Sequence, residues 1–395
     1  MTTRLYYADT YLRAFDATIV ERAEGGRRIY LDRSAFYPAS GGQPHDLGTL
    51  GGVAVTNVVD EEERVAHVLA EPYTGDDAVH GVIDWSRRWD YTQQHTGQHL
   101  LSGAFMTLFG WPTVSVHFGD VMSSLELRVP AISAAQLRRT EELANALVAE
   151  NRTVAVTYED AAAVASRLRK APVREGTLRV VTIERLDVSA CGGTHVRATG
   201  EIGAILLRRV EKLRDNTRVE FLCGARAICR ARTDYDALSD IAARLSAGVD
   251  EVAPLVLAQA DEVKAIAGAY RKLVEEVTGH RARALWKSTP PGTDGVRRLR
   301  GTDGMTPDEL RAFALACAAR PATIFAGAFR ATRTIALAVS ADLDANAGIL
   351  LKNELQKVGG RGGGSARTAQ GTVPSDEQVD TVLAALLAAA ISQAS

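Results

Sequence analysis

The strongest constraint on the fold is a pair of short motifs that lie far apart in the chain. The first is His95-Thr-Gly-Gln-His99 and the second is Cys191-Gly-Gly-Thr-His195. The residues around the first motif favour a helix, where side chains four positions apart lie on one face. In the second motif two glycines let the chain turn tightly enough to direct a thiolate and an imidazole to one point. Three histidines and one cysteine are ligands that zinc prefers, so the sequence predicts one zinc site built from both motifs.

Each motif alone would be a weak signal. Two histidines at helical spacing more often form a surface pair or a hydrogen-bonded core pair, and a single Cys-x-x-x-His motif is little more specific. Other segments accompany the motifs: 31–38 (LDRSAFYP) with Gly41-Gly-Gln43, 83–88 (IDWSRR), Ser115-Val-His117, 187–190 (DVSA) and 199–202 (TGEI). With them the chain resembles the editing domain of alanyl-tRNA synthetases and the freestanding AlaX proteins.

A second block of resemblance lies near the C-terminus. Leu350-Leu-Lys352, the glycine-rich stretch 359–364 (GGRGGG) and Ala369-Gln-Gly371 are similar to the C-terminal domain of the synthetase. The resemblance therefore covers nearly the whole chain.

Length and charge limit the classes of protein that this chain can represent. A chain of 395 residues is too long for one ordinary core, so two or three domains are expected. The formal net charge of -2 argues against a highly basic nucleic-acid coat protein and against an acidic disordered tail. Any contact with RNA must therefore come from local patches.

Cysteine usage and the N-terminal sequence indicate a cytoplasmic protein with no membrane partner. The four cysteines are few and scattered, which fits a reducing compartment, and Cys223, Cys229 and Cys317 are expected to be buried thiols. The N-terminus lacks an apolar segment after a basic start, and no stretch approaches the length of a membrane span.

The first ninety residues alternate short β-rich segments with turn clusters, which predicts a small β-barrel over residues 1–90. Within it, 37–44 (YPASGGQP) is a loop of backbone-permissive residues. Gln43 could direct its amide into a neighbouring cleft, or the loop could be a plain hairpin turn. The resemblance favours the first interpretation, because this glycine-rich Gln loop recurs in alanyl-tRNA editing proteins.

Residues 91–229 read as an α+β zinc-containing editing domain. After the His95/His99 helix come strand-like segments at 113–118 and 123–129, then a helix from 133 to about 151 with Ser133 as N-cap and Gln136 at the capping-box position. A short helix over 159–170 and a strand over 178–186 lead to Asp187 and Cys191. Asp187 is either a hydrogen-bond partner for an imidazole or an acid in a turn.

The rest of the chain is expected to form a linker and one further domain, which makes the whole an α+β protein. Residues 230–288 read as a helical hairpin interrupted near Gly248 and Pro254, and its apolar three- and four-residue steps fit packing within the chain or a homodimer seam. Residues 296–395 read as a C-terminal α/β domain whose last helix covers 375–393. A loop over 359–364 is expected between two of its elements.

This last domain also carries the residues predicted to bind RNA. Five glycines interrupted by one arginine invite close approach of a phosphate backbone, although a plain flexible loop fits the composition equally well. The resemblance to the synthetase C-terminal domain, which contacts tRNA, favours RNA binding. The residues concerned are Arg297, Arg298, Arg300, Lys352, Lys357, Gly359, Gly360, Arg361, Gly362, Gly363, Gly364 and Arg367.

Two functions are compatible with these features. The resemblance implies a zinc hydrolase that cleaves the ester of alanine tRNA misacylated with serine or glycine. The alternative is a zinc-stabilised tRNA-binding protein without catalysis. Aminoacylation is unsupported, because the chain has no Walker-type phosphate loop. Candidates for the catalytic residues are Gln43, His117, Thr113 and Ser115, and the two hydroxyl residues are candidates for contacting the hydroxyl of serine.

Overall fold

The computed structural model describes residues 1–171, 175–301 and 304–389. The chain separates into two compact units, residues 1–244 and residues 245–395. Both units mix helices and strands, which confirms the predicted α+β class. The finer division into four domains stays a prediction.

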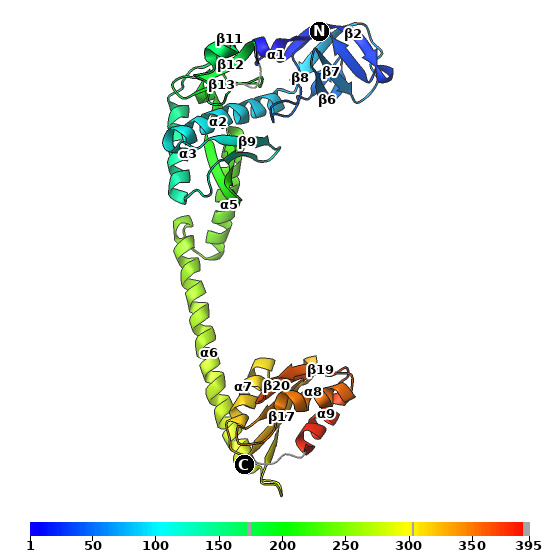
Figure 1. The fold of residues 1–395 in the computed structure, drawn as a ribbon, viewed down its shortest axis with the longest axis vertical. Helices are drawn as coiled ribbons and strands as arrows, with labels where there is room; N and C mark the ends of the chain where they lie inside the picture. Colours follow the sequence, from blue (N-terminus) through cyan, green and yellow to red (C-terminus); the bar gives the residue numbers. More distant parts are fainter. Residues whose placement is uncertain (172–174, 302–303, 390–395) are drawn as a thin grey trace. The chain divides into compact units, whose positions relative to one another are not determined.

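A closed six-stranded sheet forms the N-terminal part of the first unit (Figure 1). Its order is β2 (Ala14–Ala23), β3 (Arg28–Leu31), β7 (Arg64–Leu69), β6 (Val53–Glu61), β5 (Gly48–Leu50) and β8 (Ala78–Ile83). The sheet closes because β8 pairs with both β5 and β2. Along β2, the alternate residues Phe15, Ala17 and Ile19 are buried, as expected for a strand with one face on a core. Outside the closed sheet, β1 (Thr3–Arg4) and α1 (Leu5–Ala8) precede it, and β1 pairs with β4 (Arg33–Ser34).

The helix α2 (Trp85–Phe109) is the central element of the rest of this unit (Figure 1). The Asp84 side chain caps its first turn by accepting from the Arg87 N–H, and Gly110 ends it in the left-handed conformation that favours glycine. One sheet has the order β14 (Ile205–Leu213), β15 (Asn216–Cys223), β10 (Ser123–Leu127) and β9 (Thr113–Phe118). The other has the order β11 (Val154–Asp160), β12 (Thr177–Ile183) and β13 (Asp187–Ala190). α3 (Ala134–Ala149) begins with the predicted Ser133–Gln136 capping box.

Although α2 is rich in polar residues, every residue from Tyr91 to Phe105 is buried. Its apolar side chains Leu100, Leu101 and Phe105 belong to the core between the sheets. The polar ones bond to neighbouring elements: the Gln94 side chain accepts from the Cys223 N–H (2.9 Å) and donates to the Cys223 carbonyl (3.0 Å). This pair of bonds ties α2 to the end of β15.

In the second unit, a five-stranded sheet lies between helices. Its order is β16 (Arg297–Arg300), β17 (Thr323–Phe329), β18 (Thr334–Val339), β20 (Thr368–Thr372) and β19 (Arg361–Gly364). α7 (Pro307–Ala318) packs on one face, where Phe313 and Cys317 share a core with Phe325. α8 (Ala347–Lys357) and α9 (Glu377–Ala388) pack on the other face.

The long helix α6 (Val252–Ser288) precedes this sheet, and its C-terminal end packs against α7. Closer to the N-terminal end of α6 the apolar side chains are exposed, for example Val263 (65 %) and Ile266 (60 %). In the first unit, α5 (Ala225–Arg244) also exposes apolar residues, including Tyr235 (52 %). Whether these helix faces pack within the chain or in a homodimer stays a prediction.

Several local expectations are wrong. The expected loop over 359–364 contains the edge strand β19, because glycines allow this backbone to pack closely against β20. The expected helix over 159–170 is reduced to α4 (Ala161–Val164). The expected interruption near Gly248 is confirmed, since α5 ends at Arg244 and α6 begins at Val252, whereas Pro254 lies within the first turn of α6, where no N–H partner is needed. The expected C-terminal helix corresponds to α9, and residues 390–393 of that prediction lie outside the described residues.

The cysteines are all free. Cys223 and Cys317 are buried, as expected, but Cys229 is exposed, because most residues of α5 around it face solvent. No helix in the described part of the chain is both long and apolar enough to cross a membrane.

The buried ion pair between Arg88 and Asp46 provides a test of this packing. Arg88 of α2 is fully buried and bonds both oxygens of Asp46, and it also donates to the carbonyls of Thr10 and Ala35. We expect Arg88→Met to lower the free energy of unfolding of the first unit by about 3–5 kcal/mol, because it leaves Asp46 buried without its cation. Denaturant titration measures this loss. The double variant Arg88→Met/Asp46→Leu should recover part of it, and a further loss would contradict the explanation.

Candidate metal centre

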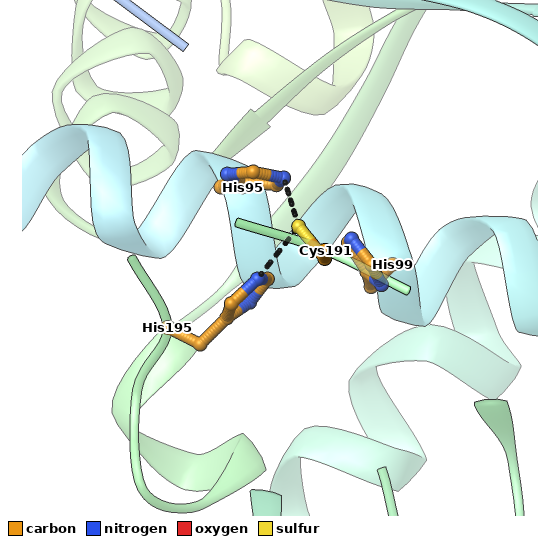
Figure 2. Close-up of side chains that lie close together, drawn as sticks. All are labelled: His95, His99, Cys191 and His195. Carbon is orange, nitrogen blue, oxygen red and sulfur yellow. Dashed lines mark hydrogen bonds between the residues drawn. The ribbon is translucent and has the colours of Figure 1, made fainter. Parts of the chain in front are cut away.

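Three imidazoles and one thiol converge beside α2 (Figure 2). His95 and His99 come from successive turns of α2, whereas Cys191 and His195 follow β13. Cys191 Sγ lies 3.4 Å from His95 Nε2 and 3.3 Å from His195 Nε2. The four candidate ligand atoms all lie within 4.8 Å of one another. The fold thus brings the two sequence motifs together at one point.

The donor set and its spacing fit a metal ion. With Zn–N bonds of about 2.0–2.1 Å and a Zn–S bond of about 2.3 Å, tetrahedral ligand atoms would stand roughly 3.5 Å apart. The two sulfur–nitrogen distances in the cluster are close to this value. The residues present can therefore hold a metal with small adjustments of the side chains.

The second nitrogen of each imidazole is already hydrogen bonded. His95 Nδ1 lies 2.8 Å from Gln43 Oε1, His99 Nδ1 lies 3.0 Å from Asp187 Oδ2, and His195 Nδ1 lies 3.2 Å from Thr96 Oγ1. Thr96 donates its own proton to the Thr92 carbonyl, so its oxygen is an acceptor for His195. Each Nδ1 therefore donates a proton, so Nε2 is the nitrogen of each ring that can bind a metal once it carries no proton.

Asp187 is a hydrogen-bond partner of an imidazole, which answers the question left open by the sequence. Its Oδ2 also accepts from Ser189 Oγ (2.9 Å), and its Oδ1 accepts from Arg169 Nε (2.5 Å). Arg169 donates to Ser189 Oγ as well (3.1 Å). This buried network fixes the Asp187 carboxylate and, through it, the plane of the His99 ring.

The turn that carries Cys191 is fixed by hydrogen bonds from Arg179 and by close packing against α2. Arg179 Nη1 donates to the carbonyls of Cys191 (2.7 Å) and Gly193 (3.0 Å). A Cβ on Gly193 would lie 2.1 Å from the His95 ring, so only glycine lets the turn approach α2 this closely. The Gly193 N–H points at Cys191 Sγ (3.4 Å), where it stabilises a thiolate.

The electrostatic surroundings favour the ligand forms of Cys191 and His195. Burial disfavours a charged Cys191, but the imidazoles of His95 and His195 outweigh it and hold the pKa of this thiol well below its usual value. Burial lowers the pKa of His195 to about 3, so this ring is neutral. Burial also opposes ionisation of Asp187, but the contacts with His99 and Arg169 lower its pKa to about 2. Burial lowers the pKa of His99, but the contacts with Asp187 and Cys191 outweigh it and raise this pKa to about 9. Metal binding requires a thiolate and neutral imidazoles, so His99 must lose a proton when a metal binds.

A cavity of about 450 Å³ opens directly onto this cluster. His95, His99 and Cys191 form part of its wall. The α2 residue Gln98 and the β9 residues Thr113, Val114 and Val116 form another part, and Arg169 and Lys170 bring positive charge. The volume lies in the range of small-molecule sites.

The structure places two of the four predicted catalytic residues at this site. Thr113 lines the cavity, and Gln43 is buried behind His95 with its amide on Thr194 Oγ1 (2.8 Å), so it orients a ligand and does not project into a cleft. Ser115 and His117 lie outside the cavity: both are exposed, opposite Glu126 and Ser124 of β10. A register shift near Leu127 turns Thr113 away from the face that Ser115 and His117 share.

Other functional residues were missed by the sequence argument. Thr96 and Gln98 lie inside the first motif, where the positions between the histidines were treated only as spacing. Gln98 is three residues from His95, which is enough to place it on the same helix face. Nothing in the sequence pattern indicates that Arg169 and Arg179 reach the site, because Arg169 lies in a loop and Arg179 comes from the strand β12, away from both motifs in the sequence.

The predicted RNA-binding cations are mostly engaged within the second unit. Arg298 and Arg300 pair with Asp294 and Asp380, Lys357 pairs with Glu354, and Arg297 and Arg367 donate to backbone carbonyls. Within the described part of the chain, Lys352 and Arg361 have no hydrogen bond or ion pair through their side chains. Gly359, Gly360 and Gly362 are explained by the fold: Gly359 has positive φ, and a Cβ on either of the other two would meet backbone atoms.

Two family models match this chain. Residues 178–220, which include Cys191 and His195, match the threonyl and alanyl tRNA synthetase second additional domain. Residues 296–392 match the DHHA1 domain.

Comparisons with individual proteins point to the same group of proteins. An alanyl-tRNA editing protein AlaX-L from Pyrococcus horikoshii is 29% identical, over 94% of this chain and 95% of its own length. The alanyl-tRNA editing protein Aarsd1 of Mus musculus is also 29% identical, over 75% of this chain and 76% of its own length. An alanine–tRNA ligase of Pyrococcus furiosus is 36% identical over 58% of this chain, which spans only 26% of the ligase. The chain belongs to the AlaX-L-like and Aarsd1-like alanyl-tRNA editing proteins and is homologous to the editing and C-terminal regions of alanyl-tRNA synthetases.

Proposed function

We propose that this protein is a trans-editing hydrolase that removes a wrongly attached amino acid, serine or glycine, from alanine tRNA by cleaving the aminoacyl ester. The observation that carries the proposal is the His95, His99, Cys191 and His195 cluster in the wall of a cavity of about 450 Å³. The editing-protein relatives, which align over most of the chain, support the same activity.

Zinc is the metal that best suits three imidazole ligands and one thiolate. His95, His99 and His195 would bind it through Nε2 and Cys191 through Sγ. When bound, zinc supplies a Lewis acid next to the cavity. The chain's own contribution is orientation. Gln43, Asp187 and Thr96 each bond to Nδ1 of one imidazole, which turns the Nε2 atoms toward one another.

The substrate end of the tRNA would enter the cavity past Arg169 and Lys170. Both residues belong to the cavity wall, and positive side chains position nucleic acids through phosphate contacts without reading sequence. We assign the chemistry to the β-barrel domain (1–90) and the zinc-containing editing domain (91–229), joined by the helical linker (230–288) to the tRNA-binding C-terminal domain (296–395).

A cleft in the C-terminal domain supports the RNA-binding role. It has a volume of about 340 Å³ and lies between α7 and the uncovered face of β20 and β19, with Arg311, Gln370 and Gly363 in its wall. A Cβ on Gly363 would meet no atom within 4 Å, so the fold does not require glycine there. A side chain at this position would partly fill the cleft, which is a reason for glycine if RNA enters it.

The alternative is a zinc-stabilised tRNA-binding protein without catalysis. Its cluster would be a closed four-ligand site of the kind that stabilises a fold. The cavity beside the cluster favours the hydrolase, because a purely structural site needs no access for a ligand.

We expect about one zinc per chain and little zinc in the double variant Cys191→Ser/His195→Ala. The double variant removes two of the four ligands that the two motifs supply. Elemental analysis of the purified proteins measures the stoichiometry. Cys229→Ser is the matched control, because this cysteine is exposed on α5 and should leave zinc unchanged. Retained zinc in the double variant would contradict the assignment of the ligands.

We expect serine-charged alanine tRNA to be deacylated much faster than alanine-charged tRNA, by at least ~100-fold in kcat/KM. A site that bonds the serine hydroxyl loses those bonds with alanine, whereas size alone discriminates weakly. Release of the labelled amino acid measures both rates on one preparation. Equal rates would remove the proofreading function, and no hydrolysis of either substrate would favour the non-catalytic alternative.

We expect residues 1–244, which form a compact unit, to keep zinc and to hydrolyse a charged acceptor-stem minihelix while losing much of the advantage on full-length tRNA. Basic side chains in the second unit would otherwise add affinity by releasing counterions from the tRNA, an effect that weakens as salt increases. Binding of tRNA at two salt concentrations tests this. If the short and full-length proteins bound tRNA equally well, the second unit would have another role, such as dimerisation.

A further inference from the structure

The threonine between Cys191 and His195 contacts the Gln43 side chain with both of its polar groups. The Thr194 backbone N–H donates to Gln43 Oε1 at 3.2 Å, and Thr194 Oγ1 accepts from Gln43 Nε2 at 2.8 Å. Both residues are buried. Because a backbone N–H can only donate, the oxygen of the Gln43 amide must be the atom that faces it. Thr194 therefore binds both ends of the amide and fixes its orientation.

The hydrogen bonds beyond Thr194 fix the direction of the hydroxyl protons as well. Thr194 Oγ1 lies 2.7 Å from Thr92 Oγ1, and Thr92 Oγ1 donates to the Arg88 carbonyl at 2.7 Å. Since Thr92 uses its one hydroxyl proton on that carbonyl, Thr194 must donate to Thr92. The lone pairs of Thr194 are then left to accept from Gln43 Nε2. This chain of bonds has one proton order, set by a backbone carbonyl of α2.

The oriented amide decides which nitrogen of His95 carries the proton. A neutral imidazole carries one proton, on either Nδ1 or Nε2. Gln43 Oε1 lies 2.8 Å from His95 Nδ1, so the amide oxygen favours the form with the proton on Nδ1. That form leaves Nε2, which lies among the candidate ligand atoms, without a proton. It is the form in which His95 can bind a metal.

A competing arrangement of protons is available to the metal-free cluster. His95 Nε2 lies 3.4 Å from Cys191 Sγ, so a proton on Nε2 could be donated to the sulfur. Nδ1 would then accept a proton from the Gln43 amide, which would have to rotate to present its nitrogen. The rotated amide would deprive the Thr194 N–H of its acceptor, and a buried donor without an acceptor is costly. Thr194 thus selects the metal-binding form of His95 against this alternative.

This role also explains the order of residues in the second motif. A Cβ on Gly193 would lie 2.1 Å from the His95 ring and 3.1 Å from Gln43 Oε1, so glycine is needed where the turn passes both groups. The next residue, Thr194, then places its N–H and its hydroxyl against the same amide. Valine has the shape of threonine but lacks the hydroxyl, so it would provide only the first of these bonds.

We propose that Thr194, supported by Thr92, is a positioning residue that holds the Gln43 amide in the orientation which keeps the proton of His95 on Nδ1. The inference rests on the proposed zinc site. It extends that site to two threonines that bind neither the metal nor the substrate. Their effect reaches the metal through Gln43 and His95.

The first test measures zinc affinity of the full-length protein by competition with a chelating dye. Thr194→Val removes the hydroxyl, and Thr92→Val removes the acceptor of the Thr194 proton. Groups that orient a metal-binding histidine typically contribute 10–100-fold to affinity, so each variant should weaken zinc binding by roughly 10-fold or more. Thr194→Ser keeps the hydroxyl and should restore most of the affinity. Thr92→Val tests the same chain of bonds from another element if Thr194→Val does not fold.

A double variant separates an effect through Gln43 from general damage. Gln43→Leu removes the amide that Thr194 orients, so Gln43→Leu/Thr194→Val should bind zinc no more weakly than Gln43→Leu alone. Thr140→Val is the matched control. Thr140 is also fully buried and donates to the Gln136 carbonyl of α3, so its loss should leave zinc affinity unchanged. Additive losses in the double variant, or unaltered affinity in Thr194→Val, would overturn the inference.

The second test needs no metal. In metal-free protein with isotope-labelled histidine, nitrogen NMR shifts show which ring nitrogen carries the proton, and His95→Gln identifies the signals of His95. We expect the proton on Nδ1 in the unaltered protein and a larger share on Nε2 in Thr194→Val. Identical shifts in the two proteins would contradict the role of Thr194. If the unaltered protein bound no zinc, the proposed zinc site would fail, whereas these shifts would still decide whether Thr194 controls His95.

Discussion

The burial of a polar helix is the constraint on which the first unit depends. α2 carries histidines, glutamines and threonines into the interior, and each buried polar group left unpaired would cost about 1–3 kcal/mol. A typical domain is stable by only about 5–15 kcal/mol, so a few buried polar groups without hydrogen-bond partners would unfold it. Neighbouring elements therefore have to present acceptors and donors at fixed places, such as the backbone of Cys223 opposite Gln94. The same bonds that satisfy the helix also orient the imidazoles.

The N-terminal sheet contributes to the site through two polar contacts. Asp46 binds Arg88 and also accepts from the Tyr37 N–H, and Gln43, between Tyr37 and Asp46 in the chain, holds His95. The loop therefore touches α2 twice, once at its first turns and once at the metal cluster. A shift of the sheet relative to α2 would break the ion pair and rotate His95 together, so folding of the sheet and geometry of the site are linked.

Much of the site could be predicted from the sequence, because His95, His99, Cys191 and His195 lie in short motifs whose local geometry limits where their side chains point. The Ser133–Gln136 capping box and the strand over 323–329 were also predictable, since their signals are local. Ser115 and His117 could not be placed in this way, because the irregular pairing of β9 with β10 decides which face each residue takes. The sequence also overestimated how many basic side chains are available to bind RNA. The charge of Arg298, for example, is evident from the sequence, but its ion pair with Asp294 is not.

The order of the metal-site residues along the chain has a consequence for biosynthesis. Gln43, His95 and His99 are translated long before Asp187, Cys191 and His195. A nascent chain on the ribosome thus carries two histidines on a polar helix whose partners do not yet exist. It can neither hold the full ligand set nor bury that helix until the strands β12 and β13 and the following turn have emerged. Chains that end before His195 therefore lack the candidate metal centre, and the cluster can bind a metal only after most of this unit has been translated.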